Sequence, residues 1–142
     1  MFRQVKFLTT VKEGYRETHY FLYKEGKIVV PVTTWQNHTA NNYLLEPPTY
    51  DTFNRTISCL GGKITSVKIY LFLAGTFYSY LVLEQNATRY EINSSFQDAL
   101  AIARETLAEY YINEEIIYEQ GIRVTKDLIE RSLSSPIDTF EY

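Results

Sequence analysis

The chain has little of the material from which metal sites and cysteine-based active sites are built. It has one cysteine, Cys59, among 142 residues, so no disulfide can form within it. Its two histidines, His19 and His38, stand in no Cys–His spacing typical of a zinc site. We interpret Cys59 as a small buried hydrophobe on the apolar side of a helix. The sequence therefore disfavours Cys59 as a catalytic nucleophile, because no histidine has a context that ties it to this thiol, and it offers no zinc-finger spacing.

Standard catalytic motifs and membrane segments are missing as well. The sequence contains no glycine-rich phosphate loop, no H-E-x-x-H and no G-x-S-x-G. Its longest apolar runs are too short to cross a bilayer. The first residues, Met1 to Lys6, lead directly into a strand-like pattern rather than a signal peptide. We expect a cytoplasmic protein with no membrane partner.

Positive charge is also scarce. Lys and Arg number 14 against 17 Asp and Glu, which gives a net charge of -3 and a pI near 5.4. Non-specific nucleic-acid binding usually needs a basic face, so the overall charge disfavours it. What the chain does have is aromatic residues, with 13 Tyr and 8 Phe. Tyrosine suits sheet faces and interfaces because its ring is apolar and its tip is polar.

The pattern of elements predicts one α+β domain, with antiparallel hairpins and packed helices, over residues 1–134, followed by a frayed tail over 135–142. Turn and capping residues separate the elements. The expected strands are 2–9, 18–23, 27–32, 64–73, 76–83, 88–93 and a short piece at 110–112. The expected helices are 49–60, 95–107, 113–118 and 125–133, with a further short one within 34–45.

Carboxylates beside helix starts are the candidate catalytic groups. Asp51 and Asp98 fall in first helical turns, Glu46 precedes one of these helices and Glu91 lies on the strand before the other. Two or more carboxylates in one pocket would suit acid–base chemistry or a bound Mg²⁺ or Mn²⁺. The alternative is that Asp51 and Asp98 only complement the helix dipole. His38 is a possible general base or simply an exposed side chain.

Several short sequence motifs, in a fixed order along the chain, resemble those of the bifunctional nuclease domain family. That family typically shows an L-P-I strand, a P-x-T-H-D motif, an L-x-D-G-T-F-Y-A hairpin, a D-A-R-P-S-D-A-I-A-L-A segment and P-I-x-V-x-E-E-V. The resemblance is best over residues 47–122. The matching words here are Val30-Pro31-Val32, Pro47-Pro48-Thr49-Tyr50-Asp51, Gly75-Thr76-Phe77-Tyr78, Asp98-Ala99-Leu100-Ala101-Ile102-Ala103 and Ile112-Asn113-Glu114-Glu115-Ile116.

The chain departs from the family pattern at polar positions. Tyr50 stands where the family has His, and Asn93 stands at the first Asp of the acidic segment. Ser95 and Phe96 replace that segment's Arg and Pro, and His38 stands where a Glu usually follows the L-P-I strand. An arginine at this position could bind a phosphate group through two parallel hydrogen bonds, and this chain lacks it.

The resemblance implies a curved mixed sheet, homo-oligomers and metal-dependent hydrolysis of DNA or RNA. It marks Asp51 and Asp98 as catalytic positions, and these two with Glu91 as ligands of Mg²⁺ or Mn²⁺. Thr49, Tyr50 and His38 occupy the expected substrate-binding positions. The second hypothesis, favoured by the substituted polar residues and the acidic charge, is a non-catalytic oligomeric module that binds a protein or small ligand.

Overall fold

The computed structural model describes residues 1–35 and 49–125. Over these ranges the chain forms strands and helices in the order β1–β2–β3–α1–β4–β5–β6–α2–β7–α3–β8. The strands are β1 Phe2–Glu13, β2 Arg16–Tyr23, β3 Ile28–Trp35, β4 Gly62–Leu73, β5 Thr76–Gln85, β6 Thr88–Ser95, β7 Glu109–Asn113 and β8 Ile122–Arg123. The helices are α1 Thr49–Cys59, α2 Phe96–Arg104 and α3 Glu114–Gln120.

The strands form one open mixed sheet in the order β6-β5-β4-β7-β1-β2-β3-β8. Every pairing in it is antiparallel except that of β4 with β7. The parallel pair arises because α2 carries the chain back across the sheet from β6 to β7. The predicted α+β class and mixed sheet are confirmed.

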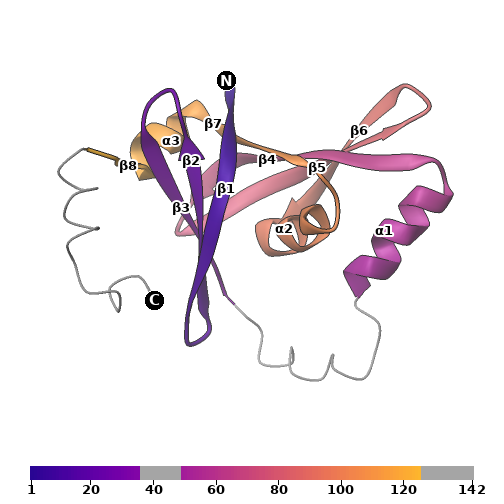
Figure 1. Cartoon of the computed structure of the whole chain (residues 1–142), viewed down its shortest axis with the longest axis horizontal. Coiled ribbons are helices and arrows are strands. Elements are labelled where there is room, and N and C mark those ends of the chain that lie inside the picture. Colours follow the sequence, from indigo (N-terminus) through magenta and orange to yellow (C-terminus); the bar gives the residue numbers. More distant parts are fainter. Residues whose placement is uncertain (36–48, 126–142) are drawn as a thin grey trace.

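Strand β1 joins the two halves of the sheet. Its first part, Phe2 to Val5, pairs with β7, and its second part, Lys6 to Glu13, pairs with β2. Figure 1 shows the consequence, since β1, β2 and β3 cross the direction of β4 and β5 and α2 lies in the angle between them. A strand that changes partners in this way curves the sheet strongly, as the family resemblance implied.

The β4–β5 hairpin is the element most fully determined by local sequence. It turns at Ala74 and Gly75, which have φ angles of 51° and 79°. Glycine adopts this left-handed region without the steric cost that a Cβ imposes, so Gly75 fits the turn. The hairpin predicted at this position is confirmed.

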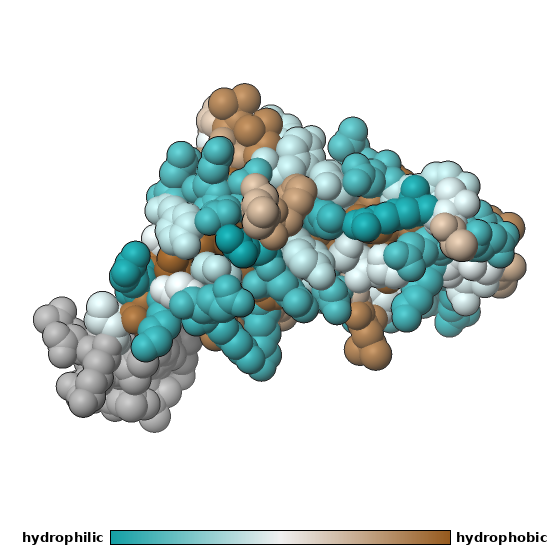
Figure 2. Space-filling model, turned by 90° about the horizontal axis from the view of Figure 1, so that it is seen from above, coloured by the Kyte–Doolittle hydropathy of each residue, from teal (hydrophilic) through white to brown (hydrophobic). Residues whose placement is uncertain are grey.

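The core fills the space between the sheet and helices α2 and α3. Phe21 lies at its centre, with ring centroids 5.8 Å from Phe96 of α2 and 5.2 Å from Tyr110 of β7. Helix α3 adds Ile116 and Ile117, both buried. Each fully buried side chain of this size contributes about 2 kcal/mol to folding. The face seen from above in Figure 2 is mostly hydrophilic, with a few separate hydrophobic groups.

Helix α1 differs from its predicted orientation. Tyr50 and Ile57, seven residues apart, pack against the core, but Cys59 is exposed and so is Leu60, at 67%. The interpretation of Cys59 as a buried hydrophobe was therefore wrong. The reason is that the buried stripe follows Tyr50 and Ile57, and Cys59, two positions beyond Ile57, points away from it.

The ends of two other predicted helices also need comment. Helix α2 ends at Arg104, and Leu107, expected within it, is 98% exposed in the turn before β7. The predicted start of the helix within 34–45 was wrong, because Thr34 and Trp35 belong to β3. The remainder of that helix, residues 126–133 of the helix predicted at 125–133, and the tail over 135–142 lie outside the described residues. In the described ranges, no helix is long and apolar enough to span a membrane.

Candidate functional site

The start of α2 positions the first candidate carboxylate. Ser95 is the N-cap, and its side chain accepts a hydrogen bond from the backbone N–H of Asp98 at 3.2 Å. This satisfies one of the N–H groups that a helix start leaves without a partner. Asp98 therefore lies in the first turn of α2, where a carboxylate interacts favourably with the helix dipole.

The hydroxyl of Tyr50 donates a hydrogen bond to Oδ1 of Asp98 at 2.6 Å. The distance is short, as expected when the acceptor is an ionised carboxylate. Nearby, Asn54 of α1 donates from Nδ2 to the carbonyl of Ile102 in α2 at 3.1 Å. Two polar contacts therefore hold α1 against α2. The first of them brings the motif that contains Tyr50 next to the motif that contains Asp98.

Asp51 is engaged along its own helix. Its carboxylate lies 3.2 Å from Nε of Arg55, one turn further along α1. The guanidinium is 79% exposed, so the pair contributes only about 0.5 kcal/mol. The hydrogen bond from α1 to Asp98 comes from Tyr50, the residue before Asp51.

Glu91 lies on a different face of the sheet. It pairs with Val82 of β5, and the adjacent pair, Leu81 with Ile92, contains the core residue Leu81. Because side chains alternate along a strand, Glu91 points away from the face that α2 covers. There it acts on Tyr80, whose pKa is raised first by burial and then by the charge of Glu91.

The donor set for a divalent cation can be tested against these positions. In residues 1–35 and 49–125, no three His, Cys, Asp or Glu side chains are grouped so that they could hold a metal ion. Asp98 gives one oxygen to Tyr50, Asp51 pairs with Arg55, and Glu91 faces away. The described residues alone do not fit a Mg²⁺ or Mn²⁺ site. His38 and Glu46 lie outside them, and for Thr49 the structure gives the backbone only.

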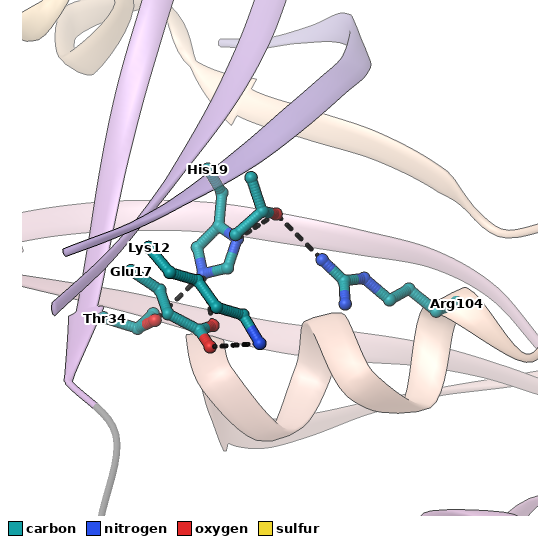
Figure 3. Close-up of polar contacts among 6 residues, drawn as sticks. Lys12, Glu17, His19, Thr34 and Arg104 are labelled. Atoms are coloured by element: carbon teal, nitrogen blue, oxygen red, sulfur yellow. Dashed lines mark hydrogen bonds and ion pairs between the residues drawn. The ribbon is translucent and has the colours of Figure 1, made fainter. Parts of the chain in front are cut away.

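A second polar cluster, which the sequence did not predict, lies along α2, from His19 beside Phe96 at its start to Arg104 at its end (Figure 3). His19 is 1% exposed, and its two ring nitrogens meet the hydroxyls of Thr10 at 2.8 Å and Thr34 at 2.9 Å. Arg104 donates to the same Thr10 hydroxyl at 2.8 Å. Glu17 lies 3.7 Å from Nε2 of His19. The cluster joins β1, β2 and β3 to α2.

Burial keeps His19 neutral. It lowers the pKa of His19 from 6.5 to about 4, an effect that Glu17 opposes and that Arg104 and Lys12 reinforce. A neutral ring bonded to two hydroxyls and closed off by Phe96, at a centroid distance of 5.7 Å, has no room for a substrate. The burial of His19 could have been inferred from the sequence by its spacing. Residues 19, 21 and 23 point to the same face of β2, and all three are buried.

Comparison with known proteins matches residues 35–125 to the bifunctional nuclease domain. The chain is also similar to two uncharacterized proteins of Mycobacterium tuberculosis, from strains CDC 1551 / Oshkosh and ATCC 25618 / H37Rv. Each is 26% identical over 117 residues, which cover 78% of this chain and 70% of the relative. The matched range spans α1 and α2 and so contains both residues of the Tyr50–Asp98 contact. The chain belongs to the bifunctional nuclease domain family.

Proposed function

We propose that this protein hydrolyses phosphodiester bonds of DNA or RNA at the Tyr50–Asp98 site. The observation that carries the proposal is the 2.6 Å hydrogen bond between these side chains. It brings together two motifs that are 48 residues apart and that both fall within the range matched by the family. A motif that is used for chemistry has to meet its partners in space, and these two do.

The arrangement suits general acid–base catalysis by Asp98. Its carboxylate would take a proton from water as the water oxygen attacks phosphorus. It would then return that proton to the leaving oxygen, so that one water is consumed for each bond broken. Tyr50 holds the carboxylate through Oδ1 and is a positioning residue in this scheme. No step passes through a metal ion, because the described residues do not complete a site for one.

The test is cleavage of a 5′-labelled single-stranded DNA oligonucleotide, with and without Mn²⁺, followed on a denaturing gel. We expect Asp98→Asn to lower the rate at least about 100-fold and Tyr50→Phe to lower it about tenfold. Glu105→Gln is the matched control, since Glu105 is an exposed carboxylate at the other end of α2. Wild-type cleavage equal to that of Asp98→Asn would overturn the proposal.

A second function, a non-catalytic assembly module that forms homo-oligomers, is supported by the edge strand β6. This strand pairs with β5 on one side only in the described part of the chain. An antiparallel pair of two β6 strands centred on Tyr90 would place Arg89 opposite Glu91 of the second copy. Opposite charges facing each other across strands stabilise such a pair. The exposed side chains of Tyr90 and Ile92 would be covered in the same contact.

Light scattering distinguishes this second function. Wild-type protein would be a dimer at micromolar concentration, and Glu91→Arg would be monomeric because like charges would then face each other. The double variant Arg89→Glu/Glu91→Arg restores complementary charge and should restore the dimer. A wild-type monomer would exclude assembly through β6, whatever the cleavage assay shows.

A further inference from the structure

A cavity of about 740 Å³ opens where β1 changes partners. It lies between the first half of β1, the end of β2 with the turn after it, and the start of β7. Its size falls within the range of small-molecule sites, which is roughly 300 to 1,000 Å³. The cavity is distinct from the Tyr50–Asp98 site, since none of its lining residues belongs to α1 or α2.

The partner change leaves main-chain groups available in this cavity. Phe2 to Val5 form their ladder with β7 and not with β2, whereas Lys6 onwards pairs with β2 and not with β7. Successive residues of a strand direct their N–H and C=O groups to alternate sides. The first half of β1 therefore presents main-chain donors and acceptors towards β2 without a strand partner there. Such groups bind ligands with defined polar edges.

The charge of the cavity wall is opposite to that of the whole chain. Three cationic side chains, Arg3, Lys6 and Lys24, line it in a protein with a net charge of -3. Within the described residues, Lys6 and Lys24 have no ion-pair partner. Arg3 has one distant contact, 3.6 Å to Glu114, and its Nε is buried with no hydrogen-bond partner in the same part of the chain. Positive charge that is not neutralised internally suits an anionic ligand.

The carboxylates of Glu25 and Glu109 also line the cavity, and each accepts a hydrogen bond from a tyrosine hydroxyl. Tyr23 donates its hydroxyl to Glu25 at 3.2 Å, and Tyr111 donates to Glu109 at 2.7 Å. These bonds reduce the ability of either carboxylate to pair with the lysines. Each carboxylate keeps its negative charge, so the wall has three cationic and two anionic side chains, and the excess of one positive charge favours an anionic ligand.

Of the aromatic residues in the wall, Phe2 lies on the same face of β1 as Lys6, whereas Phe7 and Tyr110 pack against the core on the other face. A planar heterocycle can stack on an aromatic ring, and its polar edge can bond to an unpaired strand edge. We propose that this cavity binds a nucleoside monophosphate, with the phosphate at Lys6 and Lys24 and the base against Phe2 and the free edge of β1. The ligand class rests on the proposed function, because nucleotides are the end products of phosphodiester hydrolysis.

The test is calorimetric titration with adenosine 5′-monophosphate and with adenosine. We expect wild type to bind the monophosphate at least tenfold more tightly than adenosine. The double variant Lys6→Gln/Lys24→Gln should lose at least tenfold in affinity for the monophosphate. Lys63→Gln, an exposed lysine on β4 outside the cavity, is the matched control and should stay within twofold of wild type. Both variants remove exposed lysines, so circular dichroism should show an unchanged fold.

A second readout needs no variant. In an amide NMR spectrum of the wild-type protein, the monophosphate should shift the resonances of Phe2, Tyr23 and Ala108, and leave those of α1 unchanged. Absence of saturable binding, or equal binding by the double variant, would overturn the inference. Cleavage activity without nucleotide binding would overturn the nucleotide site and leave the proposed hydrolysis standing. Nucleotide binding without cleavage would support the nucleotide site and overturn the proposed hydrolysis.

Discussion

The hydroxyl of Tyr50 lies 2.6 Å from Oδ1 of Asp98, and this contact joins α1 to α2. The family pattern has a histidine at the position of Tyr50. A phenol, like an imidazole N–H, can donate to a carboxylate, so the substitution keeps a donor at this point. It does not supply the ready proton acceptor at neutral pH that a histidine offers. In the proposed hydrolysis, acid–base chemistry at this site would therefore depend on Asp98.

The Tyr50–Asp98 bond should also contribute to stability. We expect Tyr50→Phe to lower the free energy of unfolding by about 1 kcal/mol, because the acceptor is charged but the pair is accessible to water. Urea denaturation measures this. Tyr90→Phe is the control, since Tyr90 is a half-exposed tyrosine of β6, and it should have no measurable effect. Equal midpoints for the two variants would contradict a stabilising bond.

The His19 cluster predicts a stability that depends on pH. The pKa of His19 is about 4 when folded and near 6.5 when unfolded, so the unfolded chain binds a proton more readily. The stabilisation is complete above pH 6.5 and is lost as the pH falls from there through 4. The loss should amount to about 2 kcal/mol, a value reduced for solvent screening of the neighbouring charges.

Two measurements check this pH dependence. An NMR titration of the His19 imidazole should give its midpoint near pH 4, provided that the protein remains folded at that pH. Thermal unfolding should show a melting temperature that falls steadily between pH 6.5 and pH 5. A midpoint near 6.5 for His19 would contradict the burial that the structure shows.

Core packing beneath α2 and α3 predicts a large difference between two isoleucines. Ile112 of β7 has no exposed surface, and Ile112→Ala should cost about 3 kcal/mol through lost burial and the cavity left behind. Ile122 of β8 is 55% exposed, so Ile122→Ala should cost less than about 1 kcal/mol. Denaturant titration of both variants tests the placement of β7 in the core, and similar losses would argue against it.

The exposure of Cys59 gives a chemical prediction. Because its side chain is exposed at the end of α1, native protein should react with one equivalent of a water-soluble disulfide reagent within minutes. Urea should not increase the number of thiols that react. A thiol that reacts only after unfolding would restore the buried position inferred from the sequence.

Much of the fold could be predicted because it is encoded locally. The β4–β5 hairpin follows from Gly75 at its turn, and α2 follows from Ser95 as its cap. The helix capped by Asn113 also forms as predicted, with Asn113 accepting from the N–H of Glu115 at 3.0 Å. Each of these depends on residues within a few positions of one another.

What could not be predicted depends on contacts between distant residues. The change of partner within β1 gives no sign in its own sequence, because it depends on β7 reaching Phe2 to Val5 from more than a hundred positions away. The exposure of Cys59 depends on which side of α1 meets α2 and β4. The pairing of Tyr50 with Asp98, rather than of Asp51 with Asp98, is likewise set by how these helices pack.

The candidate site shows the same division. Asp98 was located from its place in a first helical turn, and the structure puts it there. The prediction of Asp51, Asp98 and Glu91 as metal ligands stays a prediction, with Glu91 on the opposite face of the sheet. The His19 cluster was missed because its partners, Thr10, Thr34 and Arg104, come from three other elements.

The cleavage rates of wild type, Tyr50→Phe, Asp98→Asn and the double variant test the central claim most directly. If the two side chains act as one unit, the double variant should be no slower than Asp98→Asn alone, because Tyr50 acts only through that carboxylate. Losses that multiply in the double variant, or wild-type cleavage unaffected by Asp98→Asn, would contradict a hydrolytic site built on this contact.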